Sequence, residues 1–90
     1  MTHQINVTPP VPSIGGTDKG VLLEQALDAT TDLLKALYSL EQMAPHARDY
    51  VGYGADWRDQ FAKAEAEHAA RVGTIRMIIQ EVEHLGLSLT

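Results

Sequence analysis

The sequence contains no cysteine, and its basic side chains are scarce: seven Lys and Arg stand against twelve Asp and Glu in 90 residues. Without cysteine, disulfide bonds, thiolate catalysis and Cys-ligated zinc are excluded together. The net charge of −5 argues against a nucleic-acid partner, because such binding depends on Lys and Arg that neutralise phosphates. Because the chain is small and has no disulfides, it must complete its core by helix packing or by oligomerisation.

Long apolar runs are also missing. No stretch approaches the roughly 20 residues of a membrane span, and the first residues lack the charged-then-apolar pattern of a signal peptide. We therefore expect a cytoplasmic protein of one domain with no membrane partner. A Gly-rich phosphate loop, a nucleophile elbow and a Ser–His–Asp arrangement are absent as well. These absences predict a protein that is not an enzyme and has no cofactor.

Charge is absent from residues 1–16, which hold three of the four prolines. Proline keeps this segment extended, and two adjacent glycines at its end form a hinge. Two interpretations stay open: a disordered tail, or an arm that lies in a groove of a neighbouring subunit. One observation supports the second: a purely solvating tail is normally polar and charged, whereas this segment is partly aliphatic. Its aliphatic residues are Ile5, Val7, Val11 and Ile14.

The main pattern in the sequence is a helical periodicity of apolar residues. Apolar residues recur at helical spacing through two long stretches, which predicts an all-α fold. The predicted domain covers residues 17–90, with helices over about 18–44 and 57–85 joined by a linker over 45–56. The similar lengths of the helices and the short linker favour a long antiparallel helical hairpin with an extended N-terminal arm.

Polar and special residues mark the predicted helix ends. Asp18 is a candidate cap for the first helix, and Asp56 is one for the second, with an acid three residues later as in a capping box. Pro45 is expected to end the first helix, since proline cannot continue a helical hydrogen-bond ladder. Gly86 is expected to stop the second helix.

The second helix carries more apolar positions than one helix–helix seam needs. A hairpin covers only one side of each helix, so this surplus predicts a homo-oligomer in which hairpins associate into a helical bundle. The expected oligomer interface consists of Val72, Ile75, Ile78, Ile79 and Val82.

Aromatic side chains are few, but four of the five lie within residues 50–61. Aromatic faces combined with guanidinium groups are typical of stacked bases or phosphorylated small molecules, and also of protein interface hot spots. The same rings also suit a structural cap on the core. All three interpretations stay open. The candidate binding residues are His46, Arg48, Tyr50, Tyr53, Trp57 and Arg58.

A Glu-x-x-His spacing at Glu65 and His68 places both side chains on one helix face. Carboxylate-bridged di-iron bundles use this spacing. The surrounding AEAEHA stretch resembles the EKEHA-like stretch of the encapsulated-ferritin group, and this resemblance implies a metal site assembled across a dimer. A hydrogen-bonded core histidine is the simpler interpretation of His68, so we expect no metal and keep Glu65 and His68 as alternative ligands.

The function expected from these features is that of a small non-enzymatic interaction protein, working as a homo-oligomer and contacting another protein. Its size, its arm and its lack of a catalytic signature suit the accessory or inhibitory proteins that phages and mobile elements encode. Two alternatives remain. One is a protein that binds a nucleotide-like ligand through the linker aromatics and arginines, and the other is a ferritin-like metal-binding bundle.

Overall fold

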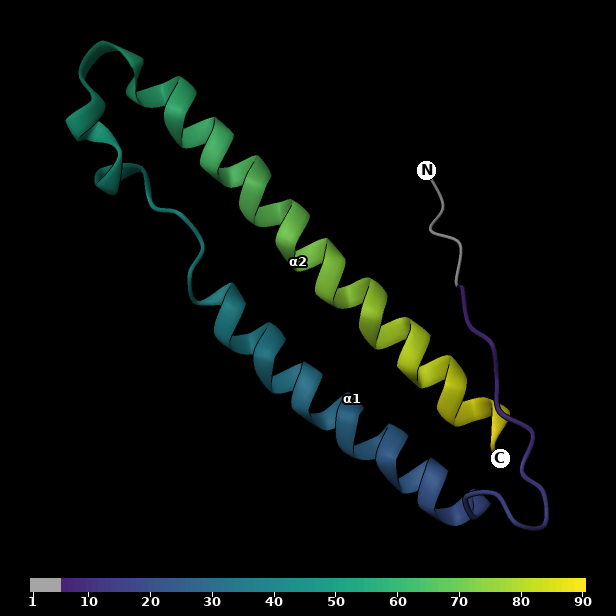
Figure 1. Cartoon of the computed structure of the whole chain (residues 1–90). Helices are drawn as coiled ribbons and strands as arrows, with labels where there is room; N and C mark the ends of the chain where they lie inside the picture. The colour runs from purple at the N-terminus through teal and green to yellow at the C-terminus, as the bar shows by residue number, and fades with distance from the viewer. Residues whose placement is uncertain (1–5) are drawn as a thin grey trace.

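The computed structural model describes residues 6–90 and contains two long α-helices, α1 (Lys19–Glu41) and α2 (Trp57–Ser88). Two short 3-10 helices, η1 (Ala47–Asp49) and η2 (Val51–Asp56), lie between them. No strand occurs among the described residues, so the predicted all-α class is confirmed. Figure 1 shows α1 and α2 side by side and running in opposite directions, and the two helices contact each other.

No helix in the described part of the chain is both long enough and apolar enough to cross a lipid bilayer. The molecule is strongly elongated, with extents of 65 × 26 × 17 Å. Its radius of gyration is 18.8 Å, whereas a compact domain of this length would have a value of about 12 Å.

The core between the helices is thin. Leu37 of α1 is 8% exposed, and Ile79 and Leu89 from the second half of the chain are 6% and 3% exposed. These are the buried hydrophobic side chains of the described residues. Each helix buries one stripe against the other, and a single contact line between two helices encloses few side chains completely.

One contact between the helices is made by two small residues. Gly86 is buried in the last part of α2, and a Cβ built on it would lie 3.6 Å from the Cβ of Ala26 in α1. The absence of a larger side chain at either position lets the two backbones come together here. This packing overturns the expectation that Gly86 stops the second helix, because α2 continues through it to Ser88.

The other helix ends agree with the sequence in part. Asp18 caps α1 as expected, and its Oδ2 accepts a hydrogen bond from the Gly20 N–H at 2.9 Å. Asp56 stands directly before α2 but makes no capping hydrogen bond, so the predicted capping box does not form. The first helix ends at Glu41, before the expected residue 44, and Pro45 disfavours helical backbone only at Ala44 directly before it.

The described part of the N-terminal segment, residues 6–16, is non-helical and runs along the end of the helix pair where the C-terminus lies (Figure 1). Val7 is half-buried. Pro10 lines a shallow groove together with residues of both helices, so this part of the arm lies over its own chain. The helical residues of this groove are Leu22, Gln25, Ala26, Ala29, Val82 and Leu85, with Leu89 just after α2. The sequence-based statement about Ile5 falls outside the described residues.

Candidate functional site

The linker end of the molecule brings three of the aromatic rings together. Tyr50 and Tyr53 stack with ring centroids 6.1 Å apart and planes 12° apart. Tyr50 also packs against Phe61 of α2, at 5.8 Å between centroids and a tilt of 48°. Tyr50 is half-buried, whereas Tyr53 remains 60% exposed. One tyrosine therefore anchors the linker to α2, and the other presents a ring to solvent.

The path of the linker depends on Gly54, which has φ 75° and ψ −133° within η2. This left-handed φ strains any residue with a Cβ, so glycine allows the chain to kink here. The kink lies between the tyrosine pair and the first turn of α2. The backbone thus separates the aromatic cluster into two parts.

Trp57 and Arg58 form the second part, at the start of α2. The Cζ atom of Arg58 lies 4.7 Å from the centroid of the Trp57 ring, within the range of a cation–π interaction. Trp57 is half-buried and Arg58 is exposed. The Arg58 side chain has no ion-pair partner within residues 6–90, so its N–H groups stay available to a ligand or partner.

The other two predicted binding residues stand apart from these rings. His46 and Arg48 are exposed and flank η1 on the linker surface. Within the described residues they show no hydrogen bond, ion pair or ring contact with the aromatic cluster. The six candidate residues therefore occupy one end of the molecule, but only Tyr50 with Tyr53, and Trp57 with Arg58, are brought into contact.

A hollow of about 330 Å³ lies beside the tyrosine pair, between the linker and α2. Tyr50 forms part of its wall, and three charged or ionisable side chains of α2, Glu67, His68 and Arg71, form another. The spacing of these three residues on one helix face is readable in the sequence. The sequence does not show that Met43 and Pro45 also line this hollow, because the path of the loop determines which of its side chains pack near the helix.

The possible metal ligands separate in the structure. His68 is half-buried and lines this hollow, while Glu65 is exposed and is absent from its walls. Among residues 6–90, no three His, Asp or Glu side chains gather in a way that could hold a metal ion. Glu67, rather than Glu65, is the carboxylate beside His68.

The residues predicted for the oligomer interface lie mostly toward the other helix. Ile79 is buried within the chain, and Val72, Ile75 and Val82 are half-buried. Ile78 is 39% exposed. Most of the predicted interface residues on α2 are therefore covered by contact with α1, while Met77, Ile78 and Leu87 of the same helix are exposed.

Comparison with known proteins found no matching family model, no matching curated protein and no matching solved structure.

Proposed function

We propose that this chain is a small non-enzymatic interaction protein that acts as a homo-oligomer of antiparallel helical hairpins. The observation that carries this proposal is the amount of apolar side chain left uncovered. Among residues 6–90, twelve large hydrophobic residues are exposed, against three that are buried. Soluble monomers rarely leave large apolar patches open, and such patches are typical of interaction sites.

The surface area supports the same proposal. The chain exposes 6806 Å², whereas a compact monomer of its mass is expected to expose about 5,200 Å². The excess of roughly 1,600 Å² is about twice the ~800 Å² that each partner buries in a stable protein–protein interface. Association of two or more copies would bring the exposed area to an ordinary value.

The linker end is the proposed contact surface for a partner protein. It combines an exposed tyrosine with Arg58 and Arg48, and these residue types contribute most to interface hot spots. Because it lies at one end of the long axis, it stays accessible when helices associate side by side. A cytoplasmic location and an accessory or inhibitory role of the phage or mobile-element kind remain predictions.

Light scattering on the purified full-length chain tests the proposed self-association. We expect a mass at least twice the monomer value of 9.8 kDa at micromolar concentration, falling on dilution. A mass that stays at the monomer value up to about 100 μM would contradict the proposal, because this concentration is well above the dissociation constant of an ordinary specific dimer.

A nucleotide-like ligand is the second candidate, favoured by the stacked tyrosines beside a hollow of about 330 Å³. This volume lies at the lower end of the roughly 300–1,000 Å³ typical of small-molecule pockets. Trp57 is the one tryptophan in the sequence, so its fluorescence reports on this end of the molecule. Titration with nucleoside monophosphates should give a saturable change that Tyr53→Ala weakens. A signal without saturation would exclude this candidate.

A further inference from the structure

An apolar row on α1 lies at the flank of the core that the two helices share, and Leu34 of this row lines a hollow beside Leu37 and Ile79. Leu27, Leu34 and Tyr38, named here the outer row, are 59%, 50% and 66% exposed. At 100° per residue these three positions fall within about 40° of one another around the helix. Leu37, the buried residue of α1, lies about 60° to 100° away from them. The outer row is therefore a second apolar stripe on the same helix.

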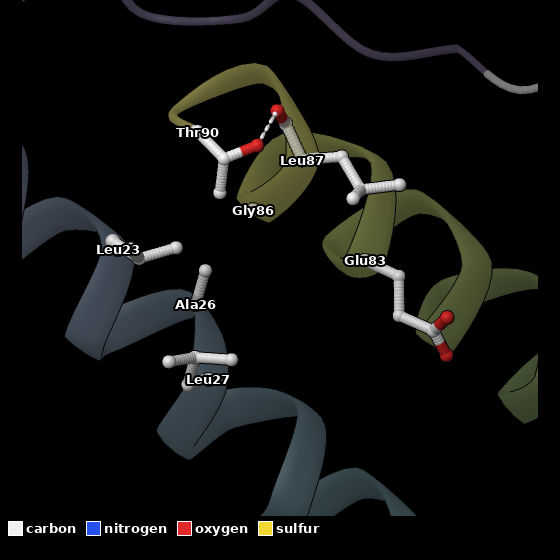
Figure 2. A pocket seen from close by; sticks show the side chains of 7 residues that line it. All are labelled: Leu23, Ala26, Leu27, Glu83, Gly86, Leu87 and Thr90. Atoms are coloured by element: carbon white, nitrogen blue, oxygen red, sulfur yellow. Dashed lines mark hydrogen bonds between the residues drawn. The ribbon is translucent and has the colours of Figure 1, made fainter.

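The outer row continues across the gap between the helices. A hollow of about 240 Å³ lies beside Leu27, with Leu23 on the α1 side and Gly86 and Leu87 on the α2 side. Figure 2 shows the leucine side chains of α1 standing at the edge of this space, opposite the last turns of α2. Leu87 is 71% exposed. The uncovered apolar surface thus extends over one face of the helix pair.

Two opposite charges flank the outer row on its solvent side. Asp28 and Lys35 are exposed and lie seven residues apart, so they share one edge of α1 at a separation of about 10 Å. This separation is too long for an ion pair within the helix. Within residues 6–90 neither side chain has an ion-pair partner.

The order of these charges selects one way of pairing two copies. If two α1 helices meet in antiparallel orientation across a two-fold axis, the same edge of each helix faces its counterpart, and Asp28 of each copy comes opposite Lys35 of the other. In a parallel two-fold pair, the charged edges of the two helices lie on opposite sides of the contact, so Asp28 and Lys35 of one copy do not face those of the other. The surface is therefore self-complementary only for a second antiparallel copy.

We propose that the outer row is the dimerisation face, and that two copies of this chain pack α1 against α1 in antiparallel orientation. In this register Leu27 of one copy lies within about 3 Å, along the helix axis, of the level of Tyr38 of the other at both ends of the contact, with Leu34 near the middle. This inference rests on the proposed self-association and assigns it to α1, whereas the apolar pattern of the sequence favours α2.

The middle of the outer row is compatible with burial. Thr31 lies there, and its hydroxyl donates a hydrogen bond to the Leu27 carbonyl at 3.0 Å. Its polar group is already satisfied within the helix, so a partner covering the row leaves no unpaired donor. The Arg76–Glu41 ion pair, at 3.4 Å, lies beyond the end of the row and stays at the rim.

Charge exchange at positions 28 and 35 tests this dimer. Asp28→Lys alone and Lys35→Asp alone each place like charges opposite one another twice, so each variant should dimerise roughly tenfold more weakly at low salt. Mixed in equal amounts, the two variants pair opposite charges again, and the mixture should recover dimers. Glu65→Lys and Lys63→Asp, which make the same charge changes at exposed positions on α2, should leave self-association unchanged. Sedimentation velocity measures all five samples.

A cysteine pair tests the register independently. The native chain has no cysteine, and positions 27 and 38 are about 16 Å apart along α1, too far to form a disulfide within one chain. Leu27→Cys combined with Tyr38→Cys should therefore give a covalent dimer on mild oxidation. Gln25→Cys combined with Ala36→Cys has the same spacing on the opposite side of α1 and should stay monomeric on a denaturing gel.

The possible results separate the two proposals. A wild-type dimer that ignores both charge variants and forms no 27–38 cross-link would overturn the α1 interface and leave self-association standing. A wild-type monomer would overturn both. Recovery of dimers in the mixture, together with the selective cross-link, would establish the antiparallel α1 contact.

Discussion

Gly73 and Gly86 belong to the same helix, yet the structure gives a side chain very different surroundings at the two positions. A Cβ on Gly73 meets no atom within 4 Å, whereas one on Gly86 faces Ala26 at 3.6 Å. At Gly73 the glycine only weakens the helix, because it raises the entropy lost on folding. At Gly86 its small size permits the helices to approach closely.

Substitution by leucine separates these two roles. Gly86→Leu should lower the free energy of unfolding by about 1–3 kcal/mol, because the larger side chain forces α1 and α2 apart. Gly73→Leu, in open space on the same helix, should raise it by about 0.5–1 kcal/mol through better helix propensity. Urea denaturation measures both. Equal effects of the two substitutions would contradict the close approach at Ala26.

Ile78 and Ile79 are chain neighbours that differ in burial, at 39% and 6% exposed. Ile79→Ala removes methyl groups from the core and should cost about 2–5 kcal/mol of stability. Ile78→Ala should cost less than about 1 kcal/mol, because its side chain is already partly in water. Thermal denaturation followed by circular dichroism gives both values. A larger loss at Ile78 would show that this residue is covered by something other than α1.

At the scale of elements, the N-terminal arm and the helix pair contribute differently to the fold. The helices contact each other directly, while residues 6–16 form no helix or strand and place Pro10 at a groove near the C-terminal end of α2. The sequence leaves two alternatives open, a tail and an arm placed on a neighbour. In the structure Pro10 lies on the helices of its own chain.

Deletion of residues 1–16 tests the arm as an element. The truncated chain should keep its helical circular dichroism signal, because the α1–α2 contact does not need the arm. It should melt about 4–8 °C lower, the shift expected for a loss near 1 kcal/mol in a domain of this size. The uncovered groove should also bind more of a hydrophobic dye. An unchanged melting temperature with unchanged dye binding would show that the arm contributes no packing.

At the scale of the whole molecule, the proposed self-association connects the elongated shape of the chain with its stability. The elongated pair encloses three buried hydrophobic residues among those described, and under the proposed self-association much of its stability comes from surface that a second copy covers. For a protein whose folded state is an oligomer, stability depends on protein concentration by mass action.

The melting temperature should therefore rise with concentration. Between 2 and 200 μM, a hundredfold range, dimerisation linked to folding adds up to about 2.7 kcal/mol of concentration-dependent free energy. We expect a rise of several degrees in differential scanning calorimetry, and a smaller one for Asp28→Lys. A melting temperature that is constant over this range would contradict folding-linked oligomerisation.

The sequence by itself determined the helical class of this protein and the approximate extent of both helices. Apolar spacing is a local signal, and it is strong in stretches of more than twenty residues. The cap at Asp18 is readable for the same reason, since a side chain and a backbone N–H two residues away are always close together. The clustering of aromatic residues at the linker is likewise a property of the chain order alone.

Only the tertiary structure decided how these local features are used. Glycine is a common helix stop, but Gly86 lies within α2 and packs against Ala26 of α1. Burial against a second helix outweighs the weak helix propensity of glycine. Tyr50 packs against Phe61 of α2, a contact between the linker and a helix that the spacing in the chain does not specify. The relative rotation of the two helices, which no single-helix pattern encodes, determines which apolar side chains stay exposed, and these include an apolar row on α1 that the sequence pattern did not single out.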